Sequence, residues 1–238
     1  MAILSIGTNA KLGEKIASYS RPVGPTCPSD CPFLSGVMPN GELVPRATMC
    51  YADKIQGRYP SVKKAWATKA YGFTKEQWQF WIEQFVKEAI HAEKKGVRAI
   101  RIHVGGDFVD QEGAPDRTYI CALLLAVRKL RRMESKIRLW FYTHAWAAMG
   151  EFISSFARLD VHAFASVHDR NNATKALAQG WRLAIDPGLP VAQIKPGFHE
   201  IFGVRSLQCP EQAKKGKITC DKCSYCFREG GNVSFFRH

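Results

Sequence analysis

Short stretches of alternating apolar and polar residues recur along this chain, and longer stretches with apolar residues at helical spacing lie between them. A capping box at 74–77 and the apolar positions that follow it, up to Ile90, predict a helix that ends at Gly96. Further helices are predicted after Pro115, around Met149 to Phe156, and at about 174–179. The predicted strands are 97–104, 137–144, 161–168, 181–185 and 200–206.

Each predicted central strand has one apolar face and one polar or aromatic face. In the strand 97–104, Ile100 and Ile102 share one face, whereas Arg101 and His103 share the other. A flat sheet covered by helices on both sides would be apolar on both faces, so the pattern favours a barrel with helices outside and a site at its mouth. We therefore expect an α/β fold: a partial parallel (β/α)6-type barrel over residues 1–208, then a small Cys-rich segment over 209–238.

Polar side chains gather where four successive predicted strands end. Because the carboxyl ends of parallel strands meet at one mouth, we expect these residues to line a ligand site. The expected catalytic residues are His103, Tyr142, His144 and His168, and the expected cofactor-binding residues nearby are Asp107, Ser166 and Asp186. Metal ligation by the histidines is disfavoured, because the cysteines supply softer ligands that are better grouped.

Seven of the eight cysteines form two groups near opposite ends of the chain. The groups are Cys27, Cys31 and Cys50 in the loop 27–50, and Cys209, Cys220, Cys223 and Cys226 in the last segment. Three thiolates leave a coordination position of a metal centre open, whereas four close it. Disulfides are the competing interpretation, and a single site built from both groups is equally compatible with the spacing. The eighth cysteine, Cys121, lies in an apolar helical run and is expected to be an inert core thiol.

The charge and the hydropathy of the chain limit its partners and its location. Lys and Arg together number 34 against 21 Asp and Glu, a formal net charge of +13, which favours nucleic acid as a partner. We find no signal peptide and no apolar run long enough for a membrane span, so we expect no membrane contact and a cytoplasmic location. A reducing cytoplasm favours metal over disulfides at the cysteines.

The motifs together resemble the radical S-adenosylmethionine superfamily: three cysteines in a loop after an N-terminal strand, Gly-Gly-Asp after the next strand, and a C-terminal cysteine group. More narrowly, the segments 26–33, 50–52 and 103–108 with the closing cysteines resemble a phage and plasmid family called gene product 88. The superfamily resemblance implies that the three N-terminal cysteines hold a [4Fe–4S] cluster and that Gly105 and Gly106 contact the methionine part of S-adenosylmethionine. It also implies that Tyr51 flanks the cluster and that the C-terminal cysteines hold an auxiliary cluster.

Two functions follow from these expectations. The first is an iron–sulfur enzyme with one or two [4Fe–4S] clusters that cleaves S-adenosylmethionine reductively, with a reductant as partner, and modifies a substrate at the barrel mouth, nucleic acid being one candidate. The alternative is a non-enzymatic basic protein of phage or plasmid origin that binds nucleic acid and is stapled by zinc or an inert cluster. Zinc is the alternative metal at the four C-terminal cysteines, because it prefers a closed set of four thiolates.

Overall fold

The computed structural model describes residues 2–7, 9–29, 31–35, 50–68, 75–110, 112–190, 196–213, 217–228 and 231–236 of the 238-residue chain. Within these ranges the strands are β1 (Ser5–Ile6), β2 (Ile16–Tyr19), β3 (Ala99–Ile102), β4 (Arg138–Thr143), β5 (Val161–Val167), β6 (Arg182–Ile185), β7 (Phe198–Ile201), β8 (Val204–Gln208) and β9 (Asn232–Ser234). The α-helices are α1 (Pro32–Ser35), α3 (Tyr51–Arg58), α4 (Pro60–Ala67), α5 (Lys75–Lys94), α6 (Arg117–Arg132), α7 (Ile153–Arg158), α8 (Arg170–Ala178), α9 (Pro210–Ala213) and α10 (Cys220–Cys223). Short 3-10 helices are η1 (Ala145–Ala147), η2 (Gly150–Phe152) and η4 (Tyr225–Phe227).

The strands form one sheet in the order β1-β2-β3-β4-β5-β6-β9-β8-β7. All pairs from β2 through β6, β9 and β8 are parallel, and only β1 and β7 pair antiparallel with their neighbours. The order β2 to β6 follows the chain, as it does in a (β/α) barrel, where each helix returns on the same side of the sheet. Because β1 and β7 are the two ends of this order, the described strands form an open sheet rather than a closed barrel. The predicted α/β class with a mainly parallel sheet is confirmed.

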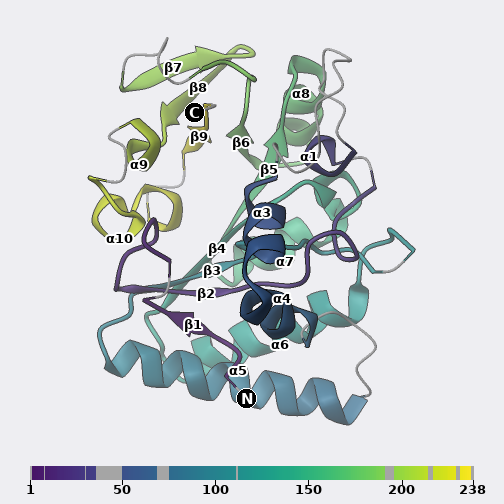
Figure 1. Ribbon diagram of the computed structural model, residues 1–238, viewed down its shortest axis with the longest axis vertical. Coiled ribbons are helices and arrows are strands. Elements are labelled where there is room, and N and C mark those ends of the chain that lie inside the picture. The colour runs from purple at the N-terminus through teal and green to yellow at the C-terminus, as the bar shows by residue number, and fades with distance from the viewer. Residues whose placement is uncertain are drawn as a thin grey trace.

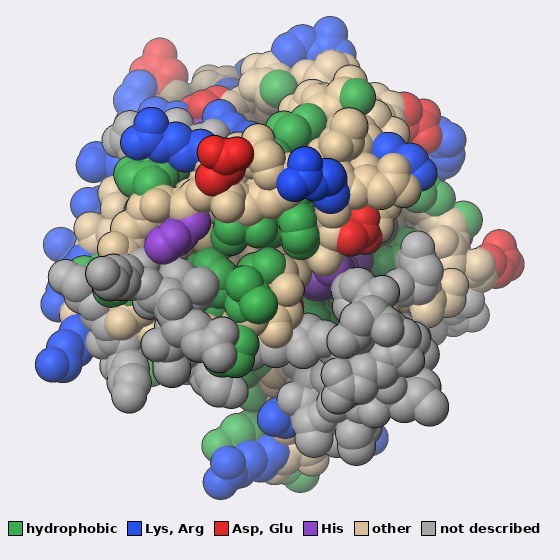
Figure 2. Space-filling model, turned by 90° about the horizontal axis from the view of Figure 1, so that it is seen from above, with side chains coloured by type: hydrophobic (Ala, Val, Ile, Leu, Met, Phe, Trp, Pro, Cys, Tyr) green, Lys and Arg blue, Asp and Glu red, His purple; other side chains and the backbone are tan. Residues whose placement is uncertain are grey.

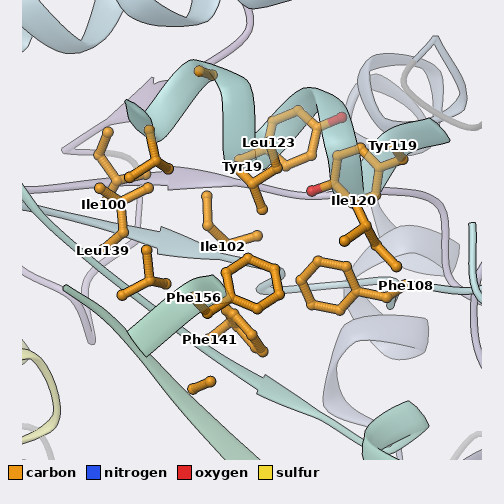
Figure 3. Packing of buried hydrophobic residues seen from close by; sticks show 14 of the residues in the cluster. Tyr19, Ile100, Ile102, Phe108, Tyr119, Ile120, Leu123, Leu139, Phe141 and Phe156 are labelled. Atoms are coloured by element: carbon orange, nitrogen blue, oxygen red, sulfur yellow. The ribbon is translucent and has the colours of Figure 1, made fainter. Parts of the chain in front are cut away.

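The main hydrophobic core lies between the sheet and its helices (Figure 1). Ile100 and Ile102 of β3 and Leu139 and Phe141 of β4 are fully buried there. They pack with residues of α6 such as Leu123, as Figure 3 shows. The period-2 alternation therefore assigns the apolar faces of β3 and β4 to the helices, as predicted.

The other face of the sheet carries two smaller clusters, which are separate from the main core. One cluster includes Ala99 and Trp140, and the other includes Phe164 and Ala184. Tyr142 packs against both clusters. This second face is mixed aromatic and polar, and it forms the floor of the site described below.

The last predicted strand, 200–206, is a hairpin instead. β7 and β8 pair antiparallel, and Phe202 and Gly203 between them both have positive φ values, 57° and 79°. Two consecutive residues with positive φ are typical of a type I′ turn, whose usual sequence is Asn-Gly or Asp-Gly. The single predicted strand is therefore wrong because Phe-Gly is not a recognisable turn signal.

The C-terminal segment completes the sheet. Its strand β9 lies between β6 and β8 and pairs parallel with both. Figure 1 shows β9, α9 and α10 close together beside the β7–β8 hairpin. The division into residues 1–208 and 209–238 stays a prediction, and the strand pairing ties the two parts together.

Two local predictions need correction. Helices α3 and α4 were not predicted, although Pro60 begins α4 at a position where proline fits a helix start. Cys121 is exposed on α6 rather than buried in the core, because α6 turns the neighbouring positions Ile120 and Ala122 toward the sheet. Most of the loop 27–50 lies outside the described residues.

Candidate functional site

A cavity lies on the second face of the sheet, at the carboxyl ends of its central strands, and we call it the strand-end pocket. Its volume is about 690 Å³, which lies within the roughly 300–1,000 Å³ range of small-molecule sites. β3 to β6 supply its floor, α1 and α3 line one part of the wall, and α9, α10 and η4 line another. Figure 2 shows hydrophobic and histidine side chains exposed on the face seen from above, with charged side chains of both signs around them.

Both cysteine groups line this one pocket. All seven cysteines face it: Cys27, Cys31, Cys50, Cys209, Cys220, Cys223 and Cys226. All eight cysteines of the chain are free thiols. The sheet topology explains why the two cysteine groups lie in one pocket, since β9 pairs with β6 and so places the C-terminal segment beside it.

The N-terminal cysteines are positioned by short local structures. The amide of Cys27 donates to the carbonyl of Gly24, and the Sγ of Cys50 accepts the amide of Asp53 at 3.3 Å as the N-cap of α3. Burial raises the pKa of the Cys27 thiol, and the negative charges of Asp107 and the neighbouring cysteines raise it further. The Cys27 thiol therefore remains protonated near neutral pH.

The C-terminal cysteines are held by contacts to distant parts of the chain. The amide of Cys220 donates to the carbonyl of Lys11, and the hydroxyl of Tyr142 donates to the Sγ of Cys226 at 3.0 Å. Burial raises the pKa of Cys220 to about 12, and the positive charge of Arg101 opposes that rise. Burial also raises the pKa of Cys226.

The Gly105-Gly106-Asp107 segment joins the end of β3 to the loop after β2. Gly106 has φ +76°, and a Cβ atom there would lie 2.6 Å from the Oγ1 of Thr26 and 2.7 Å from the carbonyl oxygen of Arg21. A Cβ atom on Gly105 would lie 2.4 Å from the Trp66 ring. Only glycine fits either position without movement of its neighbours.

The carboxylate of Asp107 accepts hydrogen bonds from neighbouring groups of the protein. It accepts from the amides of Phe108 and His144 at 2.9 and 2.8 Å, and from the hydroxyl of Thr143 at 2.5 Å. Burial raises its pKa to about 6, although these hydrogen bonds oppose the rise. Asp107 therefore ties the end of β3 to the end of β4. Its predicted cofactor-binding role, like those of Gly105 and Gly106, stays a prediction.

His103 points away from the other strand-end residues. Its φ of +60° departs from extended backbone, and its Nε2 lies 2.9 Å from the hydroxyl of Tyr119 on α6. Its ring also packs edge-on against Phe108, with 4.3 Å between the centroids. The expectation that His103 shares a face with Arg101 is therefore wrong, because a left-handed residue breaks the alternation of the strand.

His144 and His168 form a close pair at the ends of β4 and β5. Their Nε2 atoms are 3.0 Å apart, and the two rings are nearly parallel, with an interplanar angle of 2°. Phe33 of α1 lies edge-on to both rings. Asp186, after β6, places its Oδ2 3.9 Å from the Nδ1 of His168. The structure thus brings three predicted residues into one row, and it places Tyr142, Ser166 and Tyr51 on the lining of the same pocket.

Arg101 is a pocket residue that the predicted site did not include. Its guanidinium carbon lies 5.0 Å from the centroid of the Tyr142 ring. Among the described residues no carboxylate pairs with it, and its Nε is buried without a hydrogen-bond partner. The sequence already carried a signal, since Arg101 lies on the polar face of the predicted strand 97–104, opposite Ile100 and Ile102.

Together the fold and the site define an α/β protein with an open, mainly parallel sheet and a ligand-sized pocket at its strand ends. A family model described as gene product 88 matches residues 3–229, and the chain therefore belongs to the gene product 88 family. The narrower of the two resemblances is thus confirmed.

None of the curated proteins matches the chain. Among solved structures, the chain is similar to 2,3-dimethylmalate lyase, a PEP mutase/isocitrate lyase superfamily member, with a TM-score of 0.37 and 16% identity over 65% of this chain and 49% of that one. It is also similar to oxaloacetate acetylhydrolase, with a TM-score of 0.34 and 15% identity over 66% and 48% of the two chains. The chain spans about half the length of these structures.

The prediction of an iron–sulfur enzyme of radical S-adenosylmethionine type is wrong, because the arrangement of possible metal ligands does not support it. In the described ranges, no group of three or more His, Cys, Asp or Glu side chains is arranged so that it could hold a metal ion. For the alternative function, a scaffold stapled by zinc or a cluster, the described residues likewise contain no group arranged to hold the metal.

Proposed function

We propose that this chain binds a small organic anion in the strand-end pocket. The observation that carries the proposal is Arg101, whose charged side chain lies in the pocket without a carboxylate partner among the described residues. A partly buried cation without a counter-charge is costly, and an anionic ligand removes that cost. The aromatic floor, with Trp140 and Tyr142, suits a ligand whose other part is flat and apolar.

The test uses 8-anilinonaphthalene-1-sulfonate, a fluorescent probe that joins an aromatic part to a sulfonate. Arg101→Gln is expected to weaken its binding about tenfold or more, because a hydrogen bond to a charged group is worth roughly 1.5–3 kcal/mol. N-phenyl-1-naphthylamine, the uncharged analogue, is expected to bind the wild type and the variant equally.

The matched control is Arg128→Gln, which removes the same charge from an exposed position on α6. Equal binding of the sulfonate by wild type and Arg101→Gln would refute the proposal. Equal loss of sulfonate binding in both variants would also refute it, since it would reflect net charge alone.

A second proposal is that single-stranded nucleic acid is the partner, which two cation–aromatic pairs at the two ends of α3 favour. Lys11 lies over the ring of Tyr51 at 5.1 Å, and Arg58 lies over that of Tyr59 at 5.7 Å. The two tyrosines are 45% and 47% exposed. Cations beside exposed aromatic rings suit a strand whose phosphates bind the cations while its bases stack on the rings.

Fluorescence anisotropy with a fluorescein-labelled dT20 tests this partner. Binding is expected to fall steeply between 50 and 300 mM salt, and Tyr59→Ala is expected to weaken it by about 1–3 kcal/mol. Phe80→Ala is the control, since Phe80 is 65% exposed on α5. Binding that is independent of salt and of Tyr59 would refute the nucleic-acid proposal.

Other expectations remain without a test. The ligand role of the seven cysteines, and the [4Fe–4S] cluster, S-adenosylmethionine and zinc as bound cofactors, stay predictions. A reductant was expected only as the partner of such a cluster. In the part of the chain that the structure describes, no helix has the length and apolar character needed to cross a membrane. A cytoplasmic location is part of the proposal, since eight free thiols suit a reducing compartment.

A further inference from the structure

We propose that His144, His168 and Asp186 form a proton relay, in which the Nδ1 of His144 exchanges a proton with the ligand of the strand-end pocket. This inference rests on the proposed function, because it assigns chemistry to the same pocket. The implied substrates are small organic anions with a removable proton.

The hydrogen-bond geometry fixes which nitrogen faces the ligand. The Nε2 atoms of His144 and His168 are 3.0 Å apart, so one of them donates and the other accepts. Among the described residues the Nδ1 of His144 has no hydrogen-bond partner, and the residue is half-buried. His144 lines the pocket, so Nδ1 is its nitrogen that is left for a ligand.

The far end of the row holds the counter-charge. The Oδ2 of Asp186 lies 3.9 Å from the Nδ1 of His168, while its Oδ1 accepts the amide of Gly188 at 2.8 Å. A proton on the Nδ1 of His168 faces this carboxylate. The consistent set of tautomers is therefore a proton on Nε2 in His144 and a proton on Nδ1 in His168.

The proton transfer balances within this row. The Nδ1 of His144 takes a proton from the ligand, and the electron pair of the broken bond stays on the ligand. The Nε2 proton of His144 then moves to the Nε2 of His168. The positive charge comes to rest beside Asp186, and the reverse sequence returns a proton to the ligand.

The surroundings explain why the charge moves on instead of staying on His144. Burial, together with a smaller effect of the nearby His168, lowers the pKa of His144 to about 3. The ring of Phe33 covers both imidazoles edge-on. Asp107, whose carboxylate accepts the backbone amide of His144, is a further titratable group near the pair.

Long-range 1H–15N spectra of protein labelled with 15N-histidine test the relay between pH 5 and 8. We expect the Nε2–H tautomer for His144 and the Nδ1–H tautomer for His168, each assigned by its His→Gln variant. His91→Gln, on the exposed side of α5, is the control and leaves both patterns unchanged. Asp186→Asn is expected to lower the pH at which His168 gains its second proton by about one unit or more, because the counter-charge is lost.

A second measurement separates a catalytic pair from a structural one. Saturation with 8-anilinonaphthalene-1-sulfonate is expected to shift the Nδ1 signal of His144, because that nitrogen faces the pocket. The relay would be overturned if both rings had the same tautomer, or if His168 titrated in Asp186→Asn as it does in the wild type. It would also be overturned if the probe left the Nδ1 signal of His144 unchanged. If the relay pattern holds while Arg101→Gln binds the probe like wild type, the anion proposal alone fails.

Discussion

Arg21 and Asp116 form a buried ion pair that joins the loop after β2 to the start of α6. The Nη2 of Arg21 lies 2.6 Å from the Oδ2 of Asp116, and the arginine side chain has no exposed surface. Its Nη1 donates to the carbonyl of Asp107 at 3.1 Å, and its guanidinium lies over the ring of Tyr119 at 4.5 Å. The other carboxylate oxygen of Asp116 caps α6 by accepting the amide of Tyr119. This pair therefore joins the loop after β2 and the start of α6 to the backbone of Asp107, which lines the strand-end pocket.

Removal of one partner is expected to destabilise the fold strongly. Arg21→Met leaves the Asp116 carboxylate buried without its counter-charge, and the free energy of unfolding should fall by about 3–5 kcal/mol. Urea denaturation followed by circular dichroism measures this change. The control is Arg117→Gln, which breaks the exposed Arg117–Glu151 pair and should cost at most about 1 kcal/mol. Similar losses in both variants would show that the buried pair has no special role.

Asp107 gives the stability of the chain a defined pH dependence. Its pKa in the folded protein is raised from 3.8 to about 6, so the folded state holds a proton that the unfolded state has already lost. The stabilising contribution is complete below about pH 4 and is lost as the pH rises through 6. The loss amounts to roughly 3 kcal/mol at 1.4 kcal/mol per pKa unit.

Urea denaturation of the wild type and Asp107→Asn between pH 4 and 7 checks this dependence. The difference in unfolding free energy between the two proteins should change by a few kcal/mol over this range, in the direction that favours the wild type at low pH. Asp110→Asn, in the turn that follows, is the matched control. A difference that stays constant with pH would contradict the raised pKa.

The sheet could be predicted because its signal is local. In β3 and β4, alternation alone separates Ile100 and Leu139 on the helix side from Arg101 and Trp140 on the pocket side. Each of these strands is extended, so the period of two holds without knowledge of its neighbours. The site at the carboxyl ends of the strands follows from the parallel arrangement.

The parts that could not be predicted depend on non-local or unusual backbone features. Arg21 and Asp116 are 95 residues apart in the sequence, and nothing near either residue indicates the other. His103 leaves its expected face because its φ is positive. The cysteine spacing indicated two groups, but their meeting in one pocket depends on where β9 enters the sheet.

Gly106 is expected to be intolerant of a side chain for two additive reasons. A Cβ atom there would lie under 3 Å from Thr26 and from the Arg21 backbone, in addition to the strain of its positive φ. Gly113 has a similar φ, +81°, but open space around it, so Gly113→Ala measures the backbone strain alone, about 1–2 kcal/mol. Gly106→Ala should lose a further 1–3 kcal/mol or so from the forced contacts. Thermal denaturation compares the two variants, and equal melting temperatures would show that the close approach is not rigid.

Cys121 is expected to be the thiol that reacts first in the native protein. It is exposed on α6, whereas burial raises the pKa of Cys27 and Cys226 and keeps them as unreactive thiols. Native protein treated with iodoacetamide at pH 8 should gain one carbamidomethyl group well before a second, and peptide mass spectrometry should locate it at Cys121. Cys121→Ser should abolish this early step, while all eight thiols of the wild type should react in denaturant. Rapid modification of a pocket cysteine in Cys121→Ser would show that the strand-end pocket is open to a small electrophile and that its thiols are more acidic than their burial implies.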